Sequence, residues 1–189
     1  MTEDRAASGL FPDRTVRENL AVLRAEVAAA LASSLHLTEL VARIDDGRAT
    51  EDDVDFVVGL PCSGLSAAQA LCMESQAMRY VAVAHEGTGL GLCAGAWLGG
   101  KRPAALMENF GLFAITYHLL RGHYSYGIPT LIVLEYRGDG GDQEFFAESG
   151  DMTEPLLAAT RVNHRVVRDL AALKPAIRDG LRWMDFALR

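Results

Sequence analysis

The feature that most constrains the fold is a regular alternation of short apolar runs and helical patterns that begins near Asp55. The apolar runs, each bounded by glycine, proline or polar residues, occupy residues 56–60, 80–84, 103–107 and 129–136. Helical patterns lie between them, over residues 66–73, 89–98 and 112–123. Strands separated by helices of this length form right-handed βαβ units and a buried parallel sheet. We therefore predict a three-layer α/β fold around a parallel sheet.

Both ends of the chain carry helical patterns outside this alternating region. Over residues 15–44, apolar side chains recur at three- and four-residue spacing, and the Asp-Asp-Gly of residues 45–47 ends the pattern. Further helical patterns cover residues 155–173 and 176–188. We therefore predict a helical N-terminal arm over residues 1–50 and a main domain over residues 51–189 that ends in helices. The arm is expected to serve packing or subunit contact.

Composition and charge argue against several classes of function. The net charge of −7 comes without a cluster of Lys or Arg, so nucleic acid is not expected as a partner. No apolar run approaches the roughly 20 residues that a membrane span needs, and the polar first five residues lack a signal-peptide core. The cysteines and histidines lack the spacing of a disulfide framework or a zinc site. We expect a reduced, cytoplasmic protein without a metal site of its own.

Polar residues and glycines follow each of the four predicted strands at the point where the strand ends. Parallel sheets place their ligand sites beyond the carboxyl ends of the strands, and glycine lets the backbone approach a ligand closely. Any one of these loops is readily explained as a simple turn, but their concurrence indicates a site. The loops are Pro61-Cys62-Ser63-Gly64, His85-Glu86-Gly87, Asn109-Phe110-Gly111 and the Arg-Gly-Asp-Gly-Gly of residues 137–141.

Glu86 is the first candidate for a functional residue. It ends the apolar run over residues 81–84, and a glycine-rich helical pattern follows it at once. An acid at the tip of a buried strand is costly unless something binds it or it stays protonated. The alternative is an ordinary strand-end acid at the surface.

Over residues 56–157, about half of the chain, the sequence resembles the pyrimidine-binding domain of thiamine-diphosphate enzymes. Within that family it is similar to the separately encoded α subunit of sulfopyruvate decarboxylase and to the matching part of phosphonopyruvate decarboxylases. The order and spacing of the motifs are kept. The motifs are Val-Gly-Leu-Pro-Cys-Ser (58–63), His-Glu-Gly (85–87), Ala-Gly-Ala-Trp-Leu-Gly-Gly-Lys-Arg-Pro (94–103), Leu-Met-Glu-Asn-Phe-Gly-Leu (106–112), Gly-Ile-Pro-Thr-Leu (127–131) and Arg-Gly (137–138).

The resemblance implies the cofactor thiamine diphosphate and a catalytic role for Glu86. In the family, the glutamate at this position hydrogen-bonds to the ring nitrogen N1′ and drives the aminopyrimidine to its imino tautomer, which generates the reactive carbanion. The residues expected to bind the cofactor are Pro61, Glu86, Asn109 and Gly111. The residues expected to contact a substrate are Ser63, His85, Phe110 and His123.

The resemblance also implies a second polypeptide. The Gly-Asp-Gly of residues 138–140 resembles the start of the magnesium and diphosphate motif of the other thiamine-diphosphate domain, but Asn163, its counterpart, falls in a predicted helix. We interpret the tripeptide as a coincidence. A partner subunit is then expected to hold the diphosphate and Mg²⁺ in a hetero-oligomer, with the helix over residues 89–98 at an interface.

The function implied by the resemblance is that of one subunit of a 2-keto acid decarboxylase acting on a substrate like sulfopyruvate or phosphonopyruvate. Glu108 replaces the usual glutamine of the family, and Phe110 replaces a serine. The segment just after the fourth strand, residues 142–146, lacks the histidine that relatives carry there. These departures leave the identity of the substrate open. Two alternatives remain at this point. One is a thiamine-diphosphate-dependent carboligase subunit, and the other is a non-catalytic α/β scaffold subunit.

Overall fold

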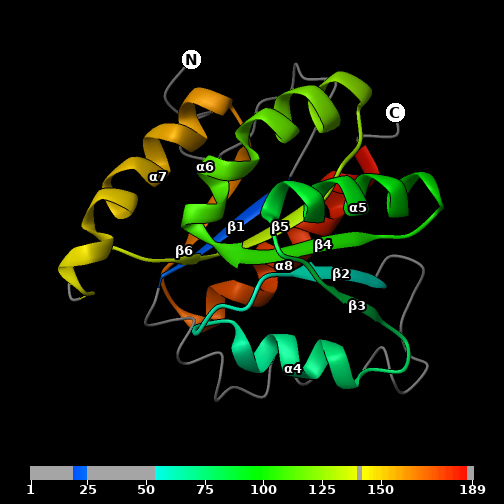
Figure 1. The fold of residues 1–189 in the computed structure, drawn as a ribbon, viewed down its shortest axis with the longest axis horizontal. Helices are drawn as coiled ribbons and strands as arrows, with labels where there is room; N and C mark the ends of the chain where they lie inside the picture. The colour runs from blue at the N-terminus through cyan, green and yellow to red at the C-terminus, as the bar shows by residue number, and fades with distance from the viewer. Residues whose placement is uncertain (1–18, 25–53, 140–141, 187–189) are drawn as a thin grey trace.

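Six short strands lie side by side in one parallel sheet, in the order β3-β2-β4-β5-β1-β6 (Figure 1). The structure is a computed structural model, and it describes residues 19–24, 54–139 and 142–186. The sheet passes through the centre of the molecule. Its strands are β1 (Asn19–Arg24), β2 (Phe56–Gly59), β3 (Arg79–Ala82), β4 (Pro103–Glu108), β5 (Leu131–Tyr136) and β6 (Asn163–Val167).

Helices cover both faces of the sheet, which confirms the predicted three-layer α/β fold (Figure 1). One face carries α4 (Ser66–Glu74) and α8 (Leu170–Phe186). The other face carries α5 (Glu86–Leu98), α6 (Asn109–His118) with a π-helical turn, η1 (Leu119–Tyr124), and α7 (Ala147–Thr160). A short 3₁₀ helix, η2 (Glu144–Phe146), leads into α7.

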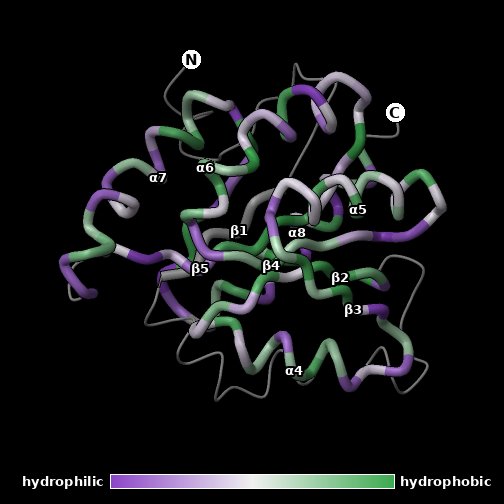
Figure 2. The backbone as a smooth tube through the Cα atoms, in the orientation of Figure 1, coloured by the Kyte–Doolittle hydropathy of each residue, from purple (hydrophilic) through white to green (hydrophobic). Residues whose placement is uncertain are grey.

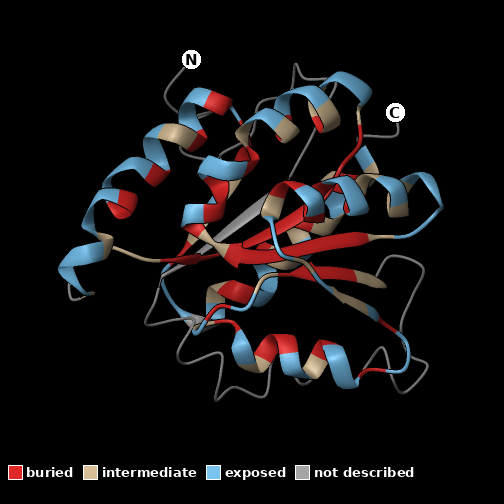
Figure 3. Ribbon diagram, in the orientation of Figure 1, coloured by how far each residue is buried: buried red, intermediate tan, exposed pale blue. Residues whose placement is uncertain are grey.

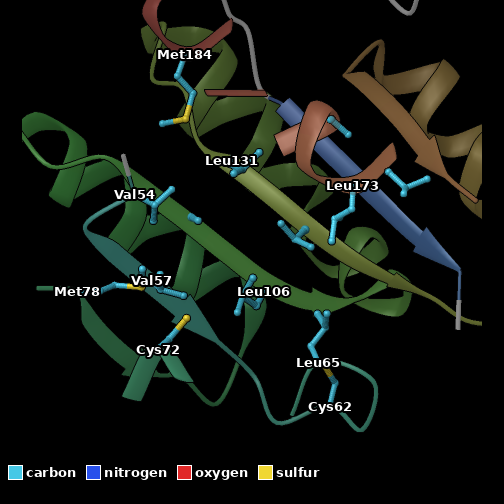
Figure 4. Close-up of a cluster of buried hydrophobic side chains, with 14 residues drawn as sticks. Val54, Val57, Cys62, Leu65, Cys72, Met78, Leu106, Leu131, Leu173 and Met184 are labelled. Atoms are coloured by element: carbon cyan, nitrogen blue, oxygen red, sulfur yellow. The ribbon is translucent and has the colours of Figure 1, made fainter. Parts of the chain in front are cut away.

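Alternating side chains of the strands feed two separate cores, as the pleat of a strand requires. Val57 packs toward α4 and α8, whereas the next residue, Val58, packs toward α5 and α6. Figure 4 shows the first core, in which Leu65 and Cys72 of the α4 region lie under Leu106 of the sheet. Strands buried on both faces are apolar almost throughout, and Figures 2 and 3 show this for the central strands β4 and β5, which lie between helices with exposed outer faces.

The direction of the chain after neighbouring strands β2 and β4 creates a crevice at their carboxyl ends. The chain leaves β2 toward α4 on one face of the sheet and leaves β4 toward α6 on the other face. Ligands of open α/β sheets bind in the crevice at such a switch of direction. The fold alone therefore marks the ends of β2 and β4 as the place for a site.

The predicted strands and the helices between them are confirmed, with small shifts at their ends. The largest shift that matters for function is at α5, which begins at Glu86 instead of residue 89. Glu86 therefore lies in the first turn of a helix and not in the loop before it. No helix within the described parts of the chain combines the length and the apolar character needed to cross a membrane.

The predicted helix over residues 15–44 is wrong at Asn19–Arg24, where the backbone forms β1 between β5 and β6. A short apolar run fits a strand or a buried helix equally well by periodicity alone. Here parallel neighbours on both sides receive its backbone hydrogen bonds. The rest of the predicted helix, and most of the predicted arm over residues 1–50, lies outside the described residues.

The predicted helix over residues 155–173 is also wrong in its middle. Helix α7 ends at Thr160, Arg161 takes a left-handed conformation (φ 56°), and β6 then pairs with β1. A left-handed residue is a common helix terminator because it turns the chain out of the helical path. Asn163 therefore lies at the start of a strand, not in a helix, and α8 is one continuous helix over the region predicted as two.

We predict that Leu90→Ala lowers the free energy of unfolding by about 2–5 kcal/mol, because it leaves a cavity in the core beneath α5. The Leu90 side chain is 0% exposed, whereas Leu92 of the same helix is 40% exposed. Leu92→Ala is the matched control, and its effect should stay within about 0.5 kcal/mol, as for ordinary surface substitutions. Urea denaturation followed by circular dichroism measures both. Equal losses would contradict the described packing of α5.

Candidate active site

The carboxyl ends of β3, β2, β4 and β5 lie at one edge of the sheet, because all four strands are parallel and adjacent. Their pairing aligns Gly59 with Ala82 on one side and with Leu106 on the other. The loops that follow these strands therefore start at similar levels along one edge. Pro61, Glu86 and Asn109 lie on this edge, as the fold prediction requires.

Glu86 occupies the first turn of α5, where a helix N-terminus favours a negative charge. His85 caps the helix, and its Nδ1 accepts a hydrogen bond of 3.0 Å from the backbone N–H of Gly87. The Glu86 side chain is half-buried. Among the described residues, its carboxyl group has neither a hydrogen-bond partner nor an ion-pair partner. Glu86 is thus a partly desolvated acid available to a ligand.

Two glycines allow α5 to lie close to both ends of α6. A Cβ atom at Gly111 would lie 2.8 Å from Cγ of Glu86 and 2.9 Å from Sδ of Met107, both too close for real atoms. A Cβ atom at Gly87 would overlap the ring of His118, the last residue of α6. Glycine at position 111 therefore lets the Glu86 side chain lie against the backbone at the start of α6, and glycine at position 87 makes room for the end of that helix.

Asn109 connects three elements next to Glu86. Its side chain is fully buried, and its Nδ2 donates to the carbonyl of Arg137 (2.9 Å) and to Oγ1 of Thr153 (2.8 Å). Its Oδ1 is buried and has no hydrogen-bond partner among the residues that the structure describes. An unpaired buried acceptor costs free energy unless a donor reaches it.

A second set of charged groups lies at the end of β5. Glu135 is 2% exposed, and its carboxylate accepts a 2.9 Å hydrogen bond from the backbone N–H of Gly64 and lies 3.5 Å from Nη1 of Arg137. Arg137 donates to both carboxylate oxygens of Asp142, at 2.8 and 3.0 Å, and stacks 3.7 Å above the ring of Phe146. The Arg137 hydrogen bonds hold the pKa of Asp142 well below its usual range. Arg137 is therefore engaged by two carboxylates.

Glu108, the last residue of β4, lies directly beside Glu135 in the sheet register. It is half-buried and, among the described residues, has no hydrogen-bond or ion-pair partner. Burial raises the pKa of the Glu108 carboxyl, the negative charge of Glu135 raises it further, and Arg137 only partly opposes these effects. The edge therefore holds two unpaired acids, Glu86 and Glu108.

Glu135 is not among the site residues predicted from the sequence, although the sequence carries a signal for it. Glu135 follows the apolar run Leu131–Leu134 in the same way that Glu86 follows the second strand. An acid that interrupts a buried strand is the same costly feature in both places. Its partners, Gly64 and Arg137, become apparent only when the sheet brings the ends of β2 and β5 together.

The structure brings three of the four predicted substrate residues to this edge. Ser63 is exposed and receives a 3.4 Å hydrogen bond from Nη1 of Arg137. His85 is exposed at the start of α5. Phe110 is 40% exposed and packs edge-to-face against Phe146, with 5.8 Å between ring centroids.

His123, the fourth predicted substrate residue, does not join this group. It lies in η1 with 1% of its surface exposed, and its ring nitrogens face the carbonyls of Ile128 (2.9 Å) and Leu90 (3.2 Å). Burial lowers the pKa of His123. His123 is therefore a packed residue that connects η1 to α5, and its side chain is not accessible to a substrate.

The first two residues of the Gly-Asp-Gly, Gly138 and Asp139, lie in a tight loop, and its third residue falls outside the described residues. Gly138 has a positive φ of 83°, and its N–H donates to Oδ2 of Asp142. A Cβ atom at Gly138 would overlap the carbonyl of Phe146. No cluster of three or more His, Cys, Asp or Glu suited to a metal ion occurs among the residues that the structure describes.

Taken together, fold and site define an α/β protein whose ligand site lies beyond the carboxyl ends of a parallel sheet. No family model matches the chain. Curated relatives do. The chain is 32% identical over 126 residues to the sulfopyruvate decarboxylase subunit alpha of Methanothermobacter thermautotrophicus, which is 66% of this chain and 76% of that relative. The chain therefore belongs to the family of the sulfopyruvate decarboxylase alpha subunits.

Two further comparisons cover less of each relative. The sulfopyruvate decarboxylase subunit alpha of Methanococcus maripaludis is 35% identical over 89 residues, which is 47% of this chain and 53% of the relative. The phosphonopyruvate decarboxylase of Streptomyces viridochromogenes is 34% identical over 91 residues, 48% of this chain and 23% of the relative. The match thus spans about half the length of the Methanococcus protein and a quarter of the Streptomyces protein.

We predict that the cysteines of the folded chain react slowly with a thiol reagent such as Ellman's reagent. All three are buried, and burial raises the pKa of Cys62 to about 12 and that of Cys72 to about 11. The thiolate is the reactive form, so Cys62 at mild alkaline pH should react about a thousandfold more slowly than an ordinary thiol. The absorbance after the chain is mixed with the reagent, with and without urea, measures the reaction rate. Ser63→Cys, an exposed neighbour, is the control that should react at once, and a fast reaction of the native chain would contradict the packing of Cys62.

Proposed function

We propose that this chain is one subunit of a two-component, thiamine-diphosphate-dependent 2-keto acid decarboxylase, in which Glu86 activates the aminopyrimidine of the cofactor. The observation that carries the proposal is the half-buried, unpaired Glu86 carboxyl beside the glycine backbone at the start of α6. Membership in the family of the sulfopyruvate decarboxylase alpha subunits supports it.

The residues at the edge fit an aminopyrimidine ring. Such a ring offers one nitrogen that can share a proton with an acid and an amino group that donates hydrogen bonds. Within the described residues, Glu86 supplies a carboxyl without a partner and Asn109 Oδ1 an acceptor without a partner, and Gly111 lets the Glu86 side chain lie against α6. Pro61 lies in the β2–α4 loop, which follows the strand next to β4. Bound thiamine diphosphate supplies a nucleophilic carbon that adds to a keto group and accepts the electrons released with carbon dioxide.

Within this chain, Glu86 holds and shares the proton at the ring nitrogen N1′. The first turn of α5 fixes its backbone, and the contact with Gly111 fixes its side chain against α6. Asn109 is held by Arg137 and Thr153, so its remaining oxygen has a fixed direction. These contacts position the acid before a ligand arrives, which is the arrangement that acid–base catalysis requires.

We propose that Mg²⁺ and the diphosphate are held by a second subunit. The described residues offer no cluster for a metal ion, and the loop at Gly138 is occupied by Asp142. The relatives that carry the family assignment are named as alpha subunits, which supports a second component. The relatives are named for sulfopyruvate and phosphonopyruvate, and we propose a 2-keto acid of this kind as the substrate.

A carboligase is the second candidate function. It shares the bond-breaking step and differs only in the acceptor of the activated fragment. The observation that favours it is the partly exposed aromatic pair of Phe110 and Phe146 at the edge, which suits an apolar acceptor aldehyde. Product analysis with a 2-keto acid, with and without an added aldehyde, separates the two activities.

We predict that Glu86→Gln leaves folding intact but slows the enzyme about 10²–10⁴-fold, the range of a general acid–base group. Glutamine keeps the shape and can bond to N1′, but it has no acidic proton to share. Hydrogen–deuterium exchange at the reactive carbon of the cofactor and turnover of the complex measure the effect. Glu74→Gln, on the exposed end of α4, is the matched control. Wild-type exchange in the Glu86→Gln complex would end the thiamine proposal.

We also predict that the isolated chain binds thiamine diphosphate weakly and shows no decarboxylation, because the diphosphate and Mg²⁺ require the second subunit. Isothermal calorimetry of the chain alone with the cofactor and Mg²⁺, compared with the complete complex, measures this. Stoichiometric, magnesium-dependent binding by the chain alone would contradict the two-component arrangement.

A further inference from the structure

The proposed decarboxylation needs a proton that Glu86 does not supply. The net reaction converts a 2-keto acid anion and one proton into an aldehyde and carbon dioxide. The bond from the keto carbon to the carboxylate breaks, and a C–H bond replaces it. Glu86 is committed to the ring nitrogen of the cofactor. A proton donor other than Glu86 must therefore deliver one proton to that carbon in every turnover.

Glu108 has the position and the freedom for this role. It is the last residue of β4, immediately before Asn109, and it lies at the crevice between the ends of β2 and β4. Its carboxyl group is half-buried and, within the described residues, engages no hydrogen-bond or ion-pair partner. An acid that is accessible, unpaired and next to the cofactor-binding residues can exchange its proton with a ligand.

The groups that face Glu108 come from every neighbouring element. Glu135 lies beside it on β5, Glu86 approaches from α5, and Cys62 lies on the β2–α4 loop. Arg137 and Asp142, from the loop after β5, also act on it. The one cation in this set, Arg137, already pairs with Asp142 and Glu135, so the carboxylate form of Glu108 gains little from it.

These surroundings favour the protonated form of Glu108. Burial is the largest cause of its raised pKa, and the charge of Glu135 is the second. Glu135 has partners of its own, because its carboxylate accepts a hydrogen bond from the N–H of Gly64 and faces Arg137. Glu108 has no such partners among the described residues, and neighbouring carboxyl groups in different surroundings can take different roles.

We propose that Glu108 is the catalytic acid that protonates the carbon from which carbon dioxide has left. This proposal rests on the proposed function. The O–H bond of the Glu108 carboxyl breaks, a C–H bond forms, and the resulting carboxylate takes a proton from water before the next turnover. No oxidant, reductant or co-reactant besides water is required.

The first test uses the full chain without cofactor. With glutamate labelled by ¹³C at the side-chain carboxyl, the Glu108 resonance is assigned by its loss in Glu108→Gln. The chemical shift of this resonance is then followed by NMR against pH, and the midpoint of the titration is read from the curve. The midpoint should lie above the roughly 4.3 of an ordinary glutamate and above that of the exposed Glu74. Glu135→Gln should lower it, since a negative neighbour is removed. A Glu108 midpoint in the ordinary range would overturn the proposal.

The second test uses the complete complex in a single turnover. Glu108→Gln should still release one carbon dioxide per site but should form aldehyde about 10²–10⁴-fold more slowly, because only the proton delivery is lost. The wild-type rate should fall as pH rises through the Glu108 pKa, since the proton is then lost, and the variant should lack this fall. Glu74→Gln is the matched control.

The outcomes separate this proposal from the one on which it rests. If the wild-type complex releases no carbon dioxide from any 2-keto acid, the decarboxylase assignment fails. If it does so and Glu108→Gln forms aldehyde at the wild-type rate, only the role of Glu108 fails. Equal slowing of carbon dioxide and aldehyde release would identify Glu108 as a structural residue and would also overturn the proposal.

Discussion

The buried carboxylate of Glu135 is the constraint on which the arrangement of the edge depends. A desolvated charge is costly unless donors and an opposite charge surround it. Glu135 obtains a donor from Gly64, in the β2–α4 loop, and an opposite charge from Arg137, just after the end of its own strand. Gly64 must be glycine, because a Cβ atom there would overlap the carboxyl group. One buried acid thus ties the β2–α4 loop to the end of β5 across the intervening β4, and it sets the charge that Glu108 experiences.

The same edge shows how backbone geometry prepares an acid for chemistry. Glu86 begins a helix that His85 caps, and glycines at positions 87 and 111 let the neighbouring helix and its side chains come close. The site residues are held by rigid elements and by buried hydrogen bonds, not by long loops. Such pre-organisation is the common physical basis for the roles proposed for Glu86 and Asn109.

The sequence predicted the parts of the fold whose signals are local. The alternation of apolar runs and helical patterns gave the strands β2 to β5 and the edge that carries Glu86 and Asn109. It failed for β1 and β6, whose extended form depends on distant parts of the chain: β6 pairs with β1, and β1 lies between β6 and β5. It also missed Glu135, whose partners are 71 residues away and two residues away, respectively. Long-range pairing, not local propensity, decides these features.

Charge at the edge bears on what the second subunit must contribute. The identified residues include the acids Glu86, Glu108, Glu135 and Asp142, against Arg137, which two of these acids engage. A diphosphate or a 2-keto acid with a second anionic group would be repelled by this surface if it stood alone. A protonated Glu108 removes one negative charge, but it adds no positive one. In the proposed enzyme, we therefore expect the second subunit to supply cations that bind the diphosphate and the substrate anion, opposite the acids described at this edge.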